Sequence, residues 1–230
     1  MIKTWKEFDI KLDTDAVLRG QGADPVLVRQ RRPMLVETAE KALDLGRPLL
    51  LPKALHSELG VEKTLHEKVM LEDGRKLEGK LVAEHLAPAE YVIVMLFTVG
   101  EKLDALITST LSENPLLGLA LDGVGSAAVE AIANEACHHF EQKAKEVGEQ
   151  ASIPLSPGMK GWPLEEGQKQ IFSILESRRI DVVLTDNSLM LPRKSLSMVQ
   201  GFGKDMKLLG SICDLCSMRE TCRYQDHYQP

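Results

Sequence analysis

The sequence predicts an α+β fold, in which a twisted antiparallel or mixed sheet carries flanking helices. Helical and strand-like segments alternate irregularly, unlike the regular strand–helix repeat of a parallel α/β sheet. A β-hairpin is expected over 61–79, where Glu72-Asp-Gly-Arg75 supplies the turn. The strongest strand signal is 91–97, a continuous apolar run that is typical of a strand buried on both faces.

In the first half of the chain, residues 24–45 carry apolar side chains at helical spacing, and Gly46 follows them as a stop signal. Pro33 divides this segment into two helices, because proline cannot donate a backbone hydrogen bond inside a helix. Residues 49–51 form a short apolar run that we interpret as a buried strand. A helix over 101–111 is expected to follow the 91–97 strand.

In the second half, residues 119–147 show the longest helical pattern, and its dense alanines allow another element to pack closely against it. Residues 151–163 are rich in proline and glycine and predict a loop. A helix over 164–178 and strands over 182–184 and 195–200 complete the expected order.

Composition excludes several function classes. The net charge of -6 and the 4% aromatic content argue against a nucleic-acid interface, which needs basic surface and stacking rings. Residues 1–9 lack the apolar core of a signal peptide, and no apolar run approaches the ~20 residues of a membrane span. We therefore expect a cytoplasmic protein with no membrane partner.

The C-terminal segment gathers three of the four cysteines, as Cys213-x2-Cys216-x5-Cys222. Thiolates at this spacing can share one soft metal centre. The two open choices are an iron–sulfur cluster with a fourth ligand from elsewhere, and a zinc site completed by His227. Structural thiols without a metal are the simpler alternative. Cys137 lies in the alanine-rich helix and is expected to be a small buried side chain.

The loop over 155–163 is the second candidate site. Pro157 fixes one backbone angle and Gly158 can adopt a positive one, so main-chain groups could face a small ligand. Trp162 offers a flat surface, although it could equally plug the core behind a rigid connection. Glu130, among the alanines, could accept a hydrogen bond from a ligand's ammonium group.

Three segments, 120–130, 155–166 and 190–197, occur in an order and spacing that resemble the activation (reactivation) domain of cobalamin-dependent methionine synthase, in its short free-standing form. The resemblance extends to about residue 203. We therefore divide the chain into an activation-like domain, 1–205, and a cysteine-rich metal- or cluster-binding tail, 206–230.

The resemblance implies a C-shaped domain that binds S-adenosylmethionine and docks on a corrinoid-carrying module. One electron and the methyl group of S-adenosylmethionine then restore methylcobalamin from the inactive Co(II) state. The cofactors supply the reactive atoms, so no catalytic residue is expected in this chain. The cofactor-binding residues that the resemblance implies, with Glu130 added, are Pro157, Gly158, Met159, Trp162, Lys194, Ser195, Ser197 and Glu130.

The chain departs from the family's ligand loop, Arg-x-x-Pro-Gly-Tyr, at two positions. Pro154 stands where the arginine should be, and Met159 stands where the tyrosine should be. Proline has no side-chain donor to grip a carboxylate. Either another cation replaces the arginine or binding of S-adenosylmethionine is weakened or lost. The candidate cations are Lys160, Arg193 and Lys194.

The sequence therefore predicts reductive reactivation of a partner corrinoid protein such as methionine synthase. S-adenosylmethionine is the candidate methyl donor, and an iron–sulfur cluster on the tail is the candidate electron relay. The alternative is a non-catalytic module that binds or assembles a corrinoid protein, with a structural zinc tail and no S-adenosylmethionine. A corrinoid methyltransferase subunit is less favoured, because the Asp-x-His-x-x-Gly cobalamin motif is absent.

Overall fold

The computed structural model describes residues 1–207 and 210–221, and it confirms the predicted α+β fold. The main sheet has seven strands, in the order β4-β3-β2-β5-β9-β6 with β1 also paired to β2. Its strand pairings are antiparallel throughout. A separate two-stranded ribbon joins β7 to β8.

The strands are β1 (Lys3–Trp5), β2 (Lys53–Leu65), β3 (Lys68–Leu71), β4 (Lys76–Glu78), β5 (Tyr91–Thr98), β6 (Gln150–Ala151), β7 (Val183–Leu184), β8 (Met190–Leu191) and β9 (Ser195–Gly203). The α-helices are α1 (Thr14–Gly20), α2 (Pro25–Arg31), α3 (Pro33–Gly46), α4 (Lys80–Leu86), α5 (Glu101–Glu113), α6 (Pro115–Glu146), α7 (Leu164–Ile174) and α8 (Ile212–Leu215). Two short 3-10 helices are η1 (Arg47–Leu49) and η2 (Ser177–Ile180).

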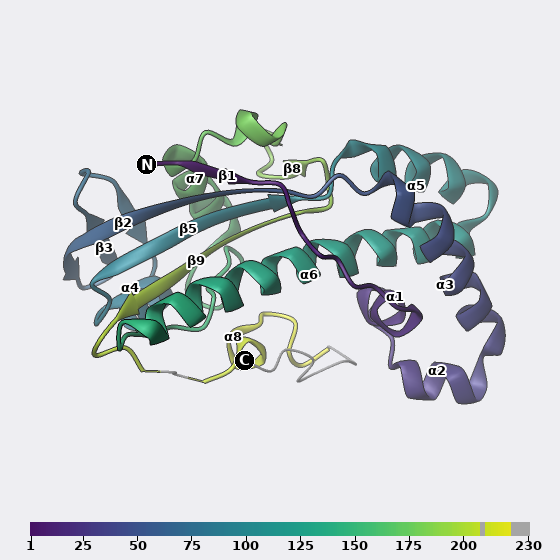
Figure 1. Ribbon diagram of the computed structural model, residues 1–230, viewed down its shortest axis with the longest axis horizontal. Coiled ribbons are helices and arrows are strands. Elements are labelled where there is room, and N and C mark those ends of the chain that lie inside the picture. Colours follow the sequence, from purple (N-terminus) through teal and green to yellow (C-terminus); the bar gives the residue numbers. More distant parts are fainter. Residues whose placement is uncertain (208–209, 222–230) are drawn as a thin grey trace.

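Strand β5 lies at the centre of the sheet, and its side chains alternate between two hydrophobic cores. Ile93, Met95 and Phe97 face the core under α6. Val94 and its neighbours at alternate positions face a second core, which α4 and α7 cover. Figure 1 shows α6 along one side of the sheet and α7 on the other. The sheet is thus buried on both faces, as the apolar run of β5 predicts.

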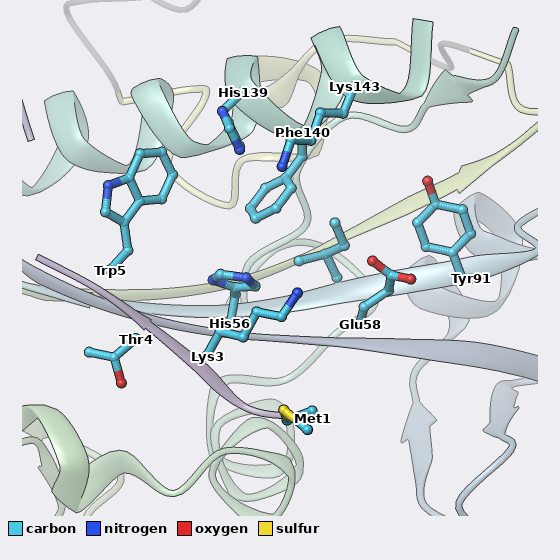
Figure 2. Close-up of a pocket in the computed structure, with 11 residues that line it drawn as sticks. Met1, Lys3, Thr4, Trp5, His56, Glu58, Tyr91, His139, Phe140 and Lys143 are labelled. Carbon is cyan, nitrogen blue, oxygen red and sulfur yellow. The ribbon is translucent and has the colours of Figure 1, made fainter. Parts of the chain in front are cut away.

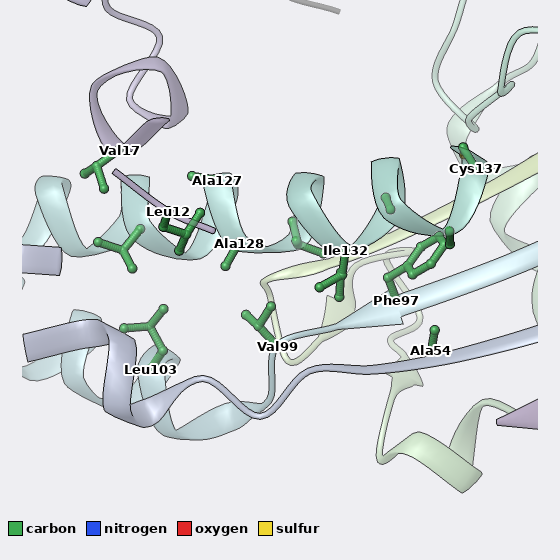
Figure 3. Close-up of a cluster of buried hydrophobic side chains, with 14 of the residues drawn as sticks. Leu12, Val17, Ala54, Phe97, Val99, Leu103, Ala127, Ala128, Ile132 and Cys137 are labelled. Carbon is green, nitrogen blue, oxygen red and sulfur yellow. The ribbon is translucent and has the colours of Figure 1, made fainter. Parts of the chain in front are cut away.

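The long helix α6 connects the sheet to a group of helices. Its sheet-facing side packs against β5 and β9, while α1, α3 and α5 gather around its N-terminal half (Figure 1). Ala127, Ala128 and Ile132 are among the buried side chains at this contact, which Figure 3 shows in close-up. Small side chains keep α6 close to its neighbours, because each alanine removes bulk that a leucine would add.

The tightest approach to α6 comes from α1. A Cβ atom added to Gly20 would lie directly against the carbonyl oxygen of Gly123, and one added to Gly123 would lie 2.7 Å from the carbonyl oxygen of Val17. These two glycines therefore let the backbones of α1 and α6 meet.

Helix α6 is long and apolar enough to cross a membrane, by length and composition alone, but 61% of its most apolar window is buried inside the protein. That burial is typical of the core helix of a globular domain.

Most predicted elements are confirmed. Pro33 does divide two helices, the 72–75 turn connects β3 to β4, and β5, α5 and α6 lie where the sequence predicted. The strand expected over 49–51 is wrong. Pro48 and Pro52 flank this run and have no N–H to add to a strand ladder, so the run forms the end of η1 and an irregular link to β2.

Three short helices, α1, α4 and α8, escaped the sequence analysis. The Asp13 side chain caps α1, accepting a hydrogen bond from the Ala16 amide at 2.7 Å. Helix α4 lies where the sequence analysis predicted no element, and three of its apolar side chains are buried against the sheet. The helix predicted over 164–178 ends earlier, at Ile174.

Candidate functional site

Two adjoining cavities lie along the outward face of α6, and we call them together the α6 groove. The smaller, of about 200 Å³, is bounded by α6, β9, the 152–163 loop and the start of α8; Glu130, Met159, Leu196 and Met198 line it. The larger, of about 410 Å³, lies between α6 and the 11–22 segment. Glu130 and Asn134 line both cavities, so the groove is continuous along the helix.

Polar side chains follow this face of α6 at every fourth residue, as Asp122, Ser126, Glu130 and Asn134. The first two hold Lys194, whose Nζ lies 2.8 Å from Asp122 Oδ1 and 3.0 Å from Ser126 Oγ. The Lys194 side chain is only 13% exposed. Its ammonium group is therefore occupied by the helix, at one end of the groove.

The aliphatic stem of Lys194 packs against α6 at Gly125, which has no side chain. A Cβ atom added to Gly125 would lie 2.6 Å from Lys194 Cγ. The other two candidate cations lie elsewhere. Arg193 donates from its backbone N–H to Asp104 Oδ2 at 2.5 Å and from its guanidinium to Thr108 Oγ1 at 3.2 Å. Lys160 is exposed. None of the three cations lines either cavity of the groove as described.

The loop over 152–163 contributes side chains to the groove more than main-chain donors. Gly158 and Gly161 have positive φ angles of 97° and 89°, as a sharp turn requires. The backbone N–H of Gly158 donates to the carbonyl of Trp162 at 2.8 Å, and that of Met159 donates to the carbonyl of Ser156 at 3.2 Å. The loop is closed on itself, and Met159 extends from it to line the smaller cavity.

Trp162 is fully buried, beneath the loop. Its ring leaves no room for a side chain at Gly79 or Gly167, and its Nε1 donates to Gln170 Oε1 at 3.3 Å. The indole therefore plugs the core shared with α7, which was one of the two roles the sequence allowed. Pro157 packs against Gly167 in the same place. Trp162 and Pro157 therefore support the loop from its core-facing side.

Ser195 and Ser197 point away from the groove, because alternate residues of a strand face opposite sides of a sheet. Ser197 is buried and its Oγ donates to Gln168 Oε1 of α7 at 3.1 Å, while Ser195 Oγ donates to the carbonyl of Pro192 at 2.7 Å. Leu196 and Met198, which alternate with these serines along β9, reach the groove instead.

Sequence reasoning missed several groove residues, among them Arg19 and Asn134. Asn134 could have been found from its position one helical turn after Glu130. Arg19 comes from α1, and only the packing of α1 on α6 brings it there. Among the described residues, no carboxylate forms an ion pair with Arg19, so its guanidinium remains available to an anionic group.

The described part of the cysteine tail begins beside the 152–163 loop. Ile212 of α8 lines the smaller cavity, and the backbone N–H of Lys160 donates to the carbonyl of Leu215 at 3.0 Å. Cys213 and Cys216 lie on and just after this helix. Helix α8 thus places both cysteines beside the loop.

The predicted metal site is only partly covered by the structure, since Cys222 and His227 lie outside the described residues. Within residues 1–207 and 210–221, no group of three or more metal-ligating side chains is assembled. The metal site remains a prediction. Cys137 is buried, 3.6 Å from the sulfur of Met198, and burial raises the pKa of its thiol to about 12. Its surroundings are those of a small core side chain.

Comparisons with known proteins show the fold. A scan against protein-family models finds no match, and neither does a search of curated proteins. Among solved structures, the chain is similar to one described as "Crystal Structure of the MetH Reactivation Domain bound to AdoHcy", with a TM-score of 0.65 and 15% sequence identity. The match covers 91% of this chain and 81% of that chain. The chain therefore has the fold of that reactivation domain, as the sequence resemblance implied.

Proposed function

We propose that this chain reactivates a partner corrinoid protein such as methionine synthase, with S-adenosylmethionine held in the α6 groove. The observation that carries the proposal is the shared fold with a MetH reactivation domain, whose crystal structure holds AdoHcy. AdoHcy differs from S-adenosylmethionine by the methyl group and the charge on sulfur. A groove that binds AdoHcy would make most of the same contacts with S-adenosylmethionine.

The groove matches this ligand class in charge. S-adenosylmethionine carries an ammonium group and a sulfonium group, and Glu130 supplies a carboxylate at the junction of the two cavities. The ligand's own carboxylate would meet Arg19 or Lys11, both of which line the larger cavity. In this arrangement Arg19 takes the part of the arginine that Pro154 replaces.

The groove also matches the ligand in size and apolar surface. The cavities of about 200 and 410 Å³ adjoin, and pockets for ligands of this size commonly hold 300–1,000 Å³. Met159, Leu196 and Met198 form an apolar wall in the smaller cavity. Sulfur-containing side chains pack well on aromatic rings, so this wall suits the adenine.

The chain would act by positioning. The partner's cobalt would receive one electron and then the methyl group of S-adenosylmethionine, and the cofactors supply the reacting atoms. The α6 groove would hold the methyl donor in one orientation against the docked partner, which lowers the entropic part of the barrier. We propose no catalytic side chain.

The proposal extends to the tail as an electron relay. Cys213 and Cys216 lie beside the loop that borders the groove, so a cluster held there would be near the docked cobalt. Anaerobic purification should give a brown protein that absorbs near ~400 nm, and Cys213→Ala or Cys216→Ala should remove the colour. A colourless protein with stoichiometric zinc would overturn the relay and favour a structural tail.

The ligand is tested by calorimetric titration of the full chain with S-adenosylmethionine and with AdoHcy. Glu130→Gln should weaken S-adenosylmethionine binding about tenfold, the worth of one charge-assisted hydrogen bond. Glu146→Gln, at the exposed end of the same helix, is the matched control and should bind normally. No heat with millimolar ligand would exclude the methyl-donor role.

A second function has an observation in its favour. Pro154 removes the expected arginine, and the smaller cavity is lined by no cation. A non-catalytic module that binds or assembles a corrinoid protein would need neither. Such a module should co-elute with cobalamin-loaded methionine synthase in size-exclusion chromatography while giving no heat with either ligand. Co-elution together with ligand heat supports reactivation instead.

A further inference from the structure

A third cavity, of about 650 Å³, lies between the C-terminal half of α6 and the sheet, and it shares no lining residue with the α6 groove. We call it the sheet-side cavity. Figure 2 shows that its roof comes from α6 and its floor from β1, β2 and β5. The side chains used below are Lys3, Trp5, His56, His139, Phe140 and Lys143.

Two lysines from different elements point into this cavity. Figure 2 shows Lys3 rising from β1 and Lys143 descending from α6. In the part of the chain that the structure describes, neither ammonium group forms an ion pair. Glu58 also lines the cavity, but it is not within ion-pair distance of either lysine. The cavity therefore holds two lysines that form no ion pair among the described residues, together with the single carboxylate of Glu58.

The pKa of His56 reflects its burial first and the neighbouring positive charges second. Burial, followed by the charges of Lys3, His139 and Lys143, lowers the pKa of His56 to about 4. The same causes, burial and Lys143, lower the pKa of His139, while Glu135 and Glu146 act against them. Near neutral pH both imidazoles are therefore uncharged, and the potential that they feel is positive. An anion in the cavity would relieve that potential.

Aromatic rings line the same cavity in a connected set. The ring centroids of Trp5 and His139 are 5.1 Å apart, those of His139 and Phe140 are 5.4 Å apart, and those of His56 and Phe140 are 5.0 Å apart. Trp5 is fixed in place, because its Nε1 donates to the carbonyl of Glu7 at 2.7 Å and its ring stacks on Phe8 at 4.8 Å. The rings meet at steep angles, 59° between Trp5 and His139 and 74° between His139 and Phe140, so a flat ligand would stack on one ring and touch the edges of the others.

We propose that the sheet-side cavity binds a planar aromatic anion, meaning a flat ring or fused ring system that carries a phosphate or a carboxylate. The ring would pack on the Trp5–His139–Phe140 surface, and Lys3 and Lys143 would neutralise the anion. The volume of about 650 Å³ is that of a nucleotide-sized pocket. The proposal does not depend on S-adenosylmethionine, because the two sites share no residue.

Calorimetric titration with guanosine 5′-monophosphate and with 2-naphthoate tests the two forms of the anion. Guanosine lacks the charge, and inorganic phosphate lacks the ring. Each control should bind at least about tenfold more weakly than the nucleotide, because each loses one of the two interactions. If neither the nucleotide nor 2-naphthoate binds more tightly than inorganic phosphate, the rings have no role and the proposal is wrong. Tighter binding of 2-naphthoate than of the nucleotide would identify a carboxylate ligand.

The lysines are tested by Lys3→Gln and Lys143→Gln, each of which should weaken nucleotide binding about three- to tenfold. Lys145→Gln makes the same charge change at another exposed position of the same helix, one that does not line the cavity, and should leave binding unchanged. Glu130→Gln, in the α6 groove, should also have no effect. Equal affinity in the three lysine variants would overturn the proposal.

A second readout needs no variant. Binding of an anion should raise the pKa of His56 in the intact protein, because a negative charge offsets those of Lys3 and Lys143. Proton NMR titration of the imidazole, with and without the nucleotide, measures this shift. An unchanged His56 titration at saturating nucleotide would place the ligand elsewhere and reject the sheet-side cavity.

Discussion

The two sides of α6 differ in packing. On the groove side, α1 meets α6 backbone to backbone at Gly20 and Gly123, and a carboxylate, Glu130, occupies the middle of the groove. On the sheet side of its C-terminal half, large rings, the Glu58 carboxylate and two lysines that form no ion pair with the described residues enclose an open space. One helix of period 3.6 can present both chemistries because residues three and four apart share a face.

The difference suggests how each side tolerates change. Close backbone contact leaves no room for an added atom, whereas a cavity can absorb altered side chains. The following substitutions would break this comparison or make it sharper.

The largest effect is expected from Gly20→Ala. Its Cβ would press on the carbonyl oxygen of Gly123 and lie 3.1 Å from the Ala127 nitrogen, so the two helices would have to separate. We expect the free energy of unfolding to fall by about 2–3 kcal/mol, measured by urea denaturation.

The control for Gly20→Ala is Gly125→Ala, where the nearest atoms belong to the flexible stem of Lys194 and to Leu103. That variant should lose less than about 1 kcal/mol, since alanine also favours the helix. An equal loss of unfolding free energy at the two glycines would show that the backbone contact of α1 with α6 adds no sensitivity to an extra side-chain atom.

A smaller effect is expected from Lys194→Met, which leaves Asp122 and Ser126 without their shared donor. Asp122 is 44% exposed, so water can replace part of the lost interaction. The stability should fall by about 1–2 kcal/mol. Lys143→Met removes a lysine without an ion pair and should change stability by less than about 0.5 kcal/mol. Thermal unfolding of both variants measures whether the ion-paired Lys194 contributes more to stability than Lys143 does.

The smallest effect concerns acid. The pKa of His56 is about 4 in the folded protein and 6.5 in the reference state, so the unfolded chain binds more protons between these values. Stability should therefore fall as the pH drops from 6.5 toward 4. Allowing for the partial exposure of His56, the loss between pH 7 and pH 5 should be about 1 kcal/mol.

His56→Gln should remove this part of the pH dependence. Urea denaturation of the two proteins at pH 7 and at pH 5 measures the difference. An identical slope in the wild type and the variant would contradict a lowered pKa at His56.

The sequence predicted the groove better than the cavity, and topology explains why. Glu130 and Met159 lie in segments with strong local patterns, an alanine-rich helix and a proline–glycine loop. Their meeting follows once α6 packs on the sheet. Ser195 and Ser197 were assigned to the ligand from the same strand, but the alternation of β9 turns them toward α7. Without knowledge of how β9 pairs, nothing in the sequence decides whether its odd-numbered or its even-numbered residues face α6.

The sheet-side cavity depends on strand pairing that no local signal reveals. Strand β1 has three residues, and it pairs with β2 so that Lys3 lies opposite His56. The 53-residue separation contains three helices and η1. A short strand of mixed polarity has no periodicity to mark it, so only the tertiary structure brings Lys3 and Trp5 beneath α6.

The order in which the chain is synthesised gives the two sites different histories. Every residue that lines the sheet-side cavity lies between Met1 and Lys143, whereas the α6 groove is incomplete until Leu196, Met198 and Ile212 have been added. A growing chain therefore carries all the components of the cavity before it carries those of the groove. An anion could meet its side chains on the ribosome, before the residues that complete the α6 groove have been added.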